Sequence, residues 1–278
     1  MATISASEVN KLRQHTGAGM MDCKKALENS NGDFDEAITY LRKQGAKVST
    51  KRSDKEANEG RVEAVTNNQQ TAGVILAANC ETDFVAKNED FTHFTQKVAQ
   101  AALEHKPADK EGLGQIAVDD TTVNTMLEDQ MAKIGEKLTI SSYHYLEGGY
   151  VVGYNHFGNQ IGVLVAFNKS GDHITQPAQD IAMQIAAMSA MAVKREDIPE
   201  DAIQQELEIA KDQARQDGKP DHIVDKIAEG KLNKFYKENT LLEQEFVKDS
   251  DKTVKDFLAE IDSELEVKSF KRIAIGGN

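Results

Sequence analysis

Cysteine is scarce in this sequence, which has only Cys23 and Cys80 among its 278 residues. Two cysteines are too few for a disulfide framework, and neither a Cys-x-x-Cys pair nor a cluster of histidines has the spacing of a zinc site. We therefore expect two reduced thiols and no bound metal.

Long hydrophobic runs are also missing. No stretch approaches the roughly 20 apolar residues of a membrane-spanning helix, and residues 1–5 lack the basic start and apolar core of a signal peptide. Lys and Arg number 33 against 46 Asp and Glu, so the formal net charge is -13. Because nucleic-acid binders need a basic surface to displace counterions, we expect a cytoplasmic protein with protein partners, no nucleic acid and no membrane contact.

Motifs of nucleotide binding and covalent catalysis are absent as well. Residues 16–20 are glycine-rich but lack the Lys-Ser/Thr ending of a phosphate-binding loop, and residues 112–114 lack a third glycine and a preceding strand. The seven histidines are scattered, and no Ser, Cys or carboxylate pair has the spacing of a nucleophile and its base. We expect neither an enzyme nor direct nucleotide binding.

What the sequence does contain is ordinary for a globular protein, with 39% hydrophobic and 28% charged residues, and it is long enough for two or three domains. Apolar spacing and turn residues predict short helices over residues 6–14, 21–28 and 34–43, which together would form a small helical domain over residues 1–45. Residues 46–58 are basic and small and read as a linker, with contact to an acidic partner as the alternative.

The middle of the chain repeats itself. Each copy predicts a strand hairpin followed by an apolar helix, so we expect an α+β fold with two related core subdomains, over residues 59–146 and 147–278. The predicted strands are residues 59–65 and 73–79 in the first copy and residues 147–153 and 162–168 in the second, and the predicted helices are residues 91–103 and 178–193.

Three further expectations concern this region. Met183, Met188 and Met191 lie in a segment that is apolar nearly all round, which predicts a buried helix. Residues 121–133 have a helical pattern. Residues 137–146 alternate as a strand does, and we expect that strand to pair with the second hairpin.

A coiled-coil hairpin is predicted as an insertion at about residues 199–238. Ile203, Leu207, Ala210 and Ala214 follow a heptad-like spacing, and residues 217–220 (DGKP) then break the helix before a second one begins. We expect an antiparallel arm that projects from the body, with an acidic, solvated surface. A helix at residues 254–261 and a strand near residues 265–275 close the chain.

The most informative segment is residues 82–88 (TDFVAKN). It follows a buried strand over residues 74–80 and precedes a helix, so Asp83 and Phe84 are expected on the connecting turn. An exposed Phe beside a carboxylate suggests a wedge that enters a partner. The alternative is local: Phe84 packs back as a helix staple and Asp83 caps the next helix.

Three segments together resemble one family. Residues 16–27 (TGAGMMDCKKAL), 82–88 (TDFVAKN) and 161–165 (IGVLV) are similar, in order and spacing, to bacterial elongation factor Ts, and the resemblance covers nearly the whole chain. It implies a ubiquitin-associated-like three-helix domain, two core subdomains and an antiparallel coiled-coil arm. It also implies a guanine nucleotide exchange factor that promotes GDP release from elongation factor Tu during translation, without a cofactor or a covalent step.

The same resemblance implies which residues bind elongation factor Tu, through its G domain and its third domain. Asp83 and Phe84 would intrude into the G domain, flanked by Thr82 and Val85. The remaining contacts would come from the helical domain and the core face: Arg13, Met20, Met21, Lys24, His156, Phe246 and Val247. Two alternatives stay open, because Met20 and Met21 could instead pack the helical domain and His156 could be a plain turn residue.

The sequence departs from the family pattern at two places. Lys248 stands where some members have Met, which makes an apolar contact there doubtful, and the sequence ends at Asn278 where longer members continue into a helix, so contacts through that helix are not expected. Self-association through the coiled coil, or a 2:2 assembly, is left open. A rival hypothesis is a ubiquitin-like-binding adaptor, which leaves Asp83 and Phe84 unexplained.

Overall fold

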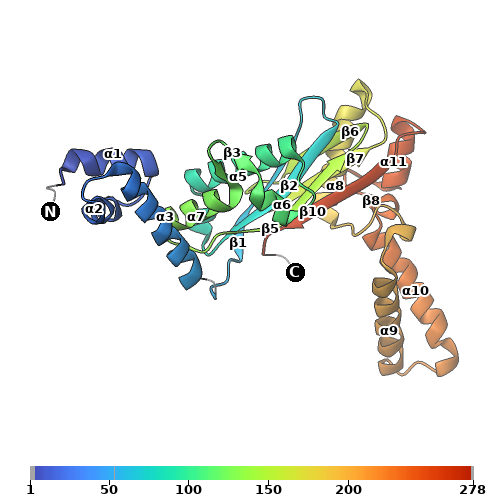
Figure 1. Cartoon of the computed structure of the whole chain (residues 1–278). Coiled ribbons are helices and arrows are strands. Elements are labelled where there is room, and N and C mark those ends of the chain that lie inside the picture. Colours follow the sequence, from blue (N-terminus) through green and yellow to red (C-terminus); the bar gives the residue numbers. More distant parts are fainter. Residues whose placement is uncertain (1–3, 53, 277–278) are drawn as a thin grey trace.

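The computed structural model describes residues 4–52 and 54–276, and of residues 46–51 it describes the backbone alone. Figure 1 shows a helical N-terminal part, a central body of helices and sheets, and a long two-helix arm. The elements are α1 (Ala6–Thr16), α2 (Met20–Asn29), α3 (Phe34–Lys51), β1 (Glu59–Thr66), β2 (Ala72–Cys80), α4 (Asp83–Ala86), α5 (Glu89–His105), α6 (Lys110–Gln115), β3 (Ala117–Val118), β4 (Thr121–Thr122), α7 (Val123–Ile134), β5 (Thr139–Glu147), β6 (Tyr150–Asn155), β7 (Ile161–Phe167), α8 (Thr175–Met188), α9 (Glu200–Gln216), α10 (Asp221–Asn239), β8 (Glu245–Phe246), β9 (Asp249–Thr253), α11 (Val254–Ile261) and β10 (Val267–Ala274).

The three N-terminal helices share a small apolar core. Helix α1 begins at a capping box, in which the Ser5 hydroxyl accepts the Glu8 N–H and the Glu8 carboxylate accepts the Ser5 N–H. It ends at Gly17, whose φ of 66° is the left-handed conformation that glycine adopts readily. The fully or nearly buried residues of this core are Val9, Leu12, Cys23, Ala26, Leu27 and Ala37.

Helix α3 is longer than the sequence predicted. The expected end at Lys43 is wrong, since the helix continues to Lys51 and enters the segment predicted as a linker. The reason is packing against α7: a Cβ at Gly45 would lie 2.8 Å from the Cβ of Ala132, so the two helices approach closely there. Residue 53 of the predicted linker lies outside the described residues, as do residues 1–3 and 277–278.

Two three-stranded antiparallel sheets, of order β1-β2-β5 and β10-β7-β6, form the body. Side chains alternate along β2, so that Val74 and Leu76 face α5 while Ile75 and Ala77 face the other sheet. In β7, Val163 and Val165 likewise face α8 while Leu164 faces the first sheet. The body therefore has four layers, with one sheet packed on the other and helices outside both.

The two predicted strand hairpins are present, β1–β2 and β6–β7. They interlock at their turns. The Val62 N–H donates to the Asn159 carbonyl at 2.6 Å, and the Val151 N–H donates to the Gln70 carbonyl, also at 2.6 Å. Each hairpin thus inserts its turn against the first strand of the other, which fixes the two sheets face to face.

Strand β5 corrects one expectation. Residues 137–146 were expected to pair with the second hairpin, but β5 pairs with β2 of the first, from Ala72 opposite Glu147 to Asn79 opposite Thr139. The equivalent strand in the second sheet is β10, which pairs with β7. The alternating pattern correctly indicated a strand, but it carries no information about which of two similar sheets the strand joins.

Helix α8 is shorter than the sequence predicted. It ends at Met188, followed by Ser189 with a left-handed φ of 52°, instead of continuing to Val193. The predicted burial of the methionines is wrong: Met188 is 45% exposed, Met191 is 50% exposed, and Met183 is half-buried. The buried face of α8 consists of Ala and Ile side chains with Gln184, whereas Met188 is the last residue of the helix and Met191 lies beyond it.

The predicted helical hairpin is formed by α9 and α10, which extend from the body as an arm (Figure 1). At the base of the arm, the Leu241 N–H donates to the Ala192 carbonyl at 2.9 Å, and the Arg195 guanidinium pairs with Glu243. The four buried residues of the arm are Ala210, Ala214, Val224 and Ala228. Within the described part of the chain, no helix combines the length and the apolar character of a membrane span.

Candidate functional site

Phe84 is a large apolar side chain that is exposed just after the buried strand β2. The segment predicted as a turn is the four-residue helix α4, and Thr82 caps it by accepting the Val85 N–H at 3.4 Å. Val85 and Ala86 pack on the core between β2 and α5, whereas Phe84 is 82% exposed. The alternative in which Phe84 packs back as a staple is therefore wrong.

Asp83 pairs within its own helix. Its carboxylate accepts from the Lys87 ammonium at 2.7 Å, and this hydrogen bond holds the pKa of Asp83 below its usual range and the pKa of Lys87 above its own. The cap of the next helix is Asn88, whose side chain accepts the Asp90 N–H at 2.8 Å. Asp83 therefore does not cap α5, and it stands beside Phe84 as a half-exposed carboxylate paired with Lys87.

Beneath α4, two carboxylates hold the chain. The Glu136 carboxylate accepts the backbone N–H groups of Glu81 and Thr82, and the Glu81 carboxylate accepts the N–H of Lys137. Sequence reasoning missed these residues. No local pattern links them, because Glu136 is far from Glu81 along the chain and only the β2–β5 pairing brings the two together.

The predicted contact residues of the helical part are exposed. Met20 is 54% and Met21 is 62% exposed, so the alternative in which they pack the helical core is wrong. Lys24, one turn after Met20, forms a long ion pair with Glu28 at 3.9 Å, and Arg13 lies exposed near the end of α1. Helix α2 therefore begins with two exposed apolar side chains, and basic side chains follow on α2 and near the end of α1.

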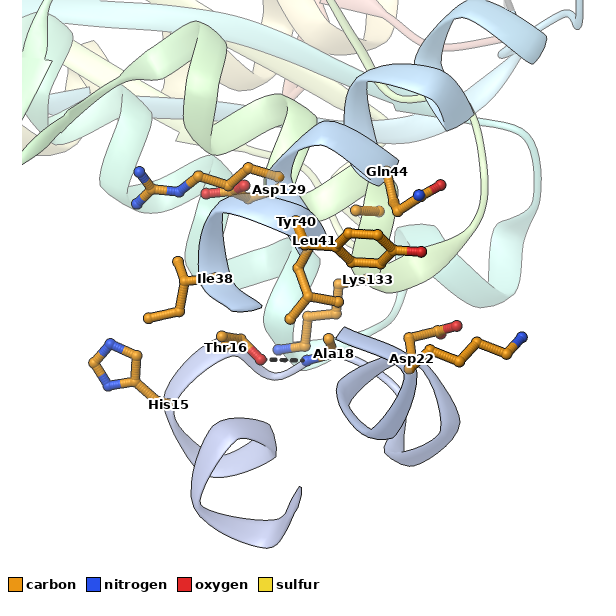
Figure 2. Close-up of a pocket in the computed structure, with 13 residues that line it drawn as sticks. His15, Thr16, Ala18, Asp22, Ile38, Tyr40, Leu41, Gln44, Asp129 and Lys133 are labelled. Carbon is orange, nitrogen blue, oxygen red and sulfur yellow. Dashed lines mark hydrogen bonds between the residues drawn. The ribbon is translucent and has the colours of Figure 1, made fainter. Parts of the chain in front are cut away.

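A cleft of about 450 Å³ is lined by residues of α1, α2, α3 and α7 (Figure 2). Lys133 reaches from α7 toward the turn between α1 and α2, where a Cβ at Gly17 would lie 2.7 Å from its ammonium. Burial raises the pKa of Asp129 on the α7 wall, and Arg42 opposes that shift. The walls carry both signs of charge, and the described residues contain no group of three or more His, Cys, Asp or Glu placed to hold a metal ion.

The predicted contact residues of the second subdomain differ in exposure. His156 is exposed at the β6–β7 turn, where its Nδ1 lies 2.9 Å from the Tyr154 hydroxyl. Val247 is 51% exposed, but Phe246 is buried and stacks on Phe257 with ring centroids 4.1 Å apart. Phe246 is therefore part of the core, and Val247 follows it at the surface. Sequence reasoning also passed over Phe157, which is 98% exposed beside His156 in a turn that Gly158 completes.

Two of these regions lie at one end of the body. Helix α4 packs on β1, and the β6–β7 turn meets the start of β1, where Gln160 donates to the Glu59 carboxylate at 3.5 Å. The exposed Phe84 and the His156 turn therefore flank the same strand end. Met20 and Met21 belong to α2, in the helical part.

Comparison with known proteins identifies relatives along the whole chain. A sequence model of the family described as Elongation factor TS matches residues 81–277. Curated proteins named elongation factor Ts are 46% identical in Christiangramia forsetii, over 99% of this chain and all of the relative, and 47% identical in Flavobacterium psychrophilum, over the same shares. The protein of that name from Aquifex aeolicus is 42% identical, over 99% of this chain and 98% of its own length.

Proposed function

The chain belongs to the elongation factor Ts family, and on that basis we propose that it releases GDP from elongation factor Tu by intrusion of Asp83 and Phe84 into the G domain. Family membership itself implies the coarser part of this statement: a cytoplasmic nucleotide exchange factor for elongation factor Tu in translation, which catalyses no covalent chemistry. The role of the two residues is our inference from the site.

The exposure of Phe84 carries the proposal. A phenylalanine that is 82% exposed contributes little to the stability of its own fold, yet α4 is anchored by Val85, Ala86 and a hydrogen-bonded cap. Burying such a side chain between helices of a G domain would contribute about 1.5 to 3 kcal/mol. That free energy would offset the displacement of the groups that hold the magnesium ion and the phosphates of GDP.

Exchange also requires that the factor leaves. Coupling between two binding sites is reciprocal, so the factor by which Phe84 weakens GDP binding equals the factor by which GDP weakens binding of this protein. A fresh nucleotide therefore displaces it. Asp83, charged and beside Phe84, would add an electrostatic contact at the same place.

The remaining contacts are proposed at two places, the helical part and the body. Arg13, Met20, Met21 and Lys24 on the helical part would contact the outer face of the G domain. His156 and Val247 on the body, the latter following the buried Phe246 in the chain, would extend the contact to the third domain of elongation factor Tu. We propose a division into a ubiquitin-associated-like domain (residues 1–45), a linker (46–58), whose first residues continue helix α3 as far as Lys51, and two core subdomains (59–146 and 147–278, with the coiled coil inserted at about 199–238).

The first prediction tests Phe84 directly. Phe84→Ala should slow stimulated release of labelled GDP by roughly ten-fold or more, because the burial is lost in the transition state. Its free energy of unfolding should change by no more than about 0.5 kcal/mol, as for other exposed positions. Ile209→Ala is a matched control, since Ile209 is an apolar, 41% exposed helical residue on the arm and should alter neither quantity.

Two outcomes would contradict the proposal. One is normal GDP release by Phe84→Ala with a much lower melting temperature, which would make Phe84 a structural residue. The other is tight binding of GDP to this protein alone in calorimetry, which the absence of a phosphate-binding loop argues against. A ubiquitin-like-binding adaptor would in addition fail to enrich elongation factor Tu from a bacterial lysate.

A further inference from the structure

The segment that presents Phe84 is held from below by a reciprocal pair of carboxylates. We infer that Glu136 is a positioning residue for nucleotide exchange: it fixes the orientation of α4, and thereby of Phe84, before the partner binds. The inference rests on the proposed role of Phe84.

Glu136 makes three hydrogen bonds to the start of α4. Its Oε2 accepts the backbone N–H groups of Glu81 and Thr82, each at 3.1 Å, and its Oε1 accepts the Thr82 hydroxyl at 2.8 Å. The same hydroxyl oxygen accepts the Val85 N–H as the cap of α4. Glu136 therefore fixes both the backbone that leads into α4 and the side chain that caps it.

Glu81, in turn, binds the segment that carries Glu136. The Glu81 carboxylate accepts the Lys137 N–H at 2.6 Å and the Arg52 guanidinium at 2.7 Å, and these bonds, the Lys137 N–H first, hold the pKa of Glu81 below its usual range. We call Glu81, Thr82, Glu136 and Lys137 the carboxylate clasp. Each carboxylate binds the backbone of the opposite segment, so neither segment can shift without breaking bonds to the other.

The local backbone explains why Glu136 can reach this position. Helix α7 ends at Gly135, whose φ of 80° is left-handed and turns the chain sharply after the helix. Glu136 then lies shortly before β5, which begins at Thr139 and pairs with β2 up to Asn79 opposite Thr139. The two strand ends therefore bring Glu136 alongside Glu81.

Helix α4 needs such support. A helix of four residues has too few internal hydrogen bonds to be stable alone, so its orientation depends on its cap and on its contacts with the body. Without the clasp, α4 would be held chiefly by the packing of Val85 and Ala86 and by the bond from the Cys80 thiol to the Thr82 carbonyl, and it would sample other orientations. A protein that is competent to bind for only a fraction of the time binds more weakly by that fraction.

The test measures stimulated GDP release against the concentration of this protein, for Glu136→Ala in the full chain. If α4 held its competent orientation only about a third of the time, the half-saturating concentration would rise about three-fold while the maximal rate stayed near that of the parent. Glu136→Gln keeps the shape and one acceptor, and should lie between the parent and Glu136→Ala. Amide hydrogen exchange at Glu81 and Thr82 should accelerate in both variants.

Asp109→Ala is the matched control. Asp109 also accepts a backbone N–H, that of Gly112 at 2.7 Å, but it caps α6 beyond the far end of α5 from Phe84. The Asp109→Ala variant should lose its hydrogen bond to a backbone N–H and leave GDP release unchanged. A fall in release for Asp109→Ala equal to that for Glu136→Ala would show general destabilisation and overturn the inference.

A double mutant separates this inference from the proposed function. If Glu136 acts through Phe84, then Glu136→Ala should have little further effect in a Phe84→Ala background. Losses that multiply would overturn the positioning role, as would normal release by Glu136→Ala alongside slow release by Phe84→Ala. If Phe84→Ala itself releases GDP normally, the proposed function fails first, and any effect of Glu136→Ala then has another origin.

Discussion

Gln184 is a buried polar residue within the apolar pattern of α8. Its side chain is fully buried in a helix that otherwise packs with Ala and Ile. Its Oε1 accepts the Val247 N–H at 2.7 Å, and its Nε2 donates to the Glu245 carbonyl at 3.1 Å. A buried amide can be accommodated because its own oxygen and nitrogen are hydrogen-bonded, the nitrogen also to the Oε1 of the buried Gln244 at 3.1 Å. It also fixes the backbone that carries the exposed Val247.

Gln184→Leu should therefore destabilise the protein, although Leu is the more apolar residue. The Oε1 of the buried Gln244 would lose its donor and the partly buried Val247 N–H would lose its acceptor, and each unpaired buried group costs about 1 to 3 kcal/mol. We expect a loss of at least about 2 kcal/mol in the free energy of unfolding, measured in urea. Gln176→Leu, on the exposed side of the same helix, should change it by less than about 0.5 kcal/mol. Equal effects of the two variants would show that the buried bonds contribute nothing.

At the scale of elements, local patterns were enough for some structures and not for others. Alternation predicted both hairpins, and heptad spacing with Gly218 and Pro220 predicted the arm, because those signals reside in the segments themselves. The pairing of β5 with β2, the extension of α3 and the clasp around Glu136 depend on contacts between distant segments. A single sequence records no such contact, so these features had to come from the structure.

The arm is an element whose core is its own. Its buried residues Ala210, Ala214, Val224 and Ala228 pack between α9 and α10. Its base is closed by a backbone bond from the Met191 N–H to the Asn239 carbonyl at 2.8 Å, beside the bond from Leu241 to Ala192. The body therefore already brings the two ends of the arm together.

Replacing residues 202–236 with a short Gly/Ser linker should remove helical signal in circular dichroism and leave the body's cooperative melting transition in place. The melting temperature should fall by only a few degrees, because the backbone bonds at the base close the connection and no buried residue of the three body clusters lies in the replaced segment. Scanning calorimetry of the two proteins makes the comparison. Loss of the transition would show that the arm is part of the folding unit of the body.

At the scale of the whole molecule, α7 joins the parts. Its Ala132 faces Gly45 of α3, and its Lys133 lies against Gly17 and forms an ion pair with Asp90 of α5 at 2.7 Å. Immediately after it comes Glu136, which holds the start of α4. The helical part, which carries Met20 and Met21, and the segment that carries Phe84 are thus both positioned from one helix and the two residues that follow it.

The apolar cores nevertheless divide cleanly. Among the described residues, the small N-terminal cluster includes nothing beyond Leu41, and the three body clusters include nothing before Val62. Each sheet has its own helices and its own buried side chains. Such a body has what it needs to fold without the first helices.

Removal of residues 1–45 should therefore weaken binding to elongation factor Tu and leave a body that still melts cooperatively. The melting temperature should fall modestly, because the α7 surface around Ala132 loses its cover. Met20→Ser with Met21→Ser in the full chain is the matched variant: it should reproduce the loss of binding, seen by calorimetric titration, with an unchanged melting temperature, since both side chains are exposed. If the truncated protein has no thermal transition, the N-terminal helices and the body form one core. If truncation weakens binding and the double substitution does not, the helical part acts through other residues or by orienting α7, and not through its two methionines.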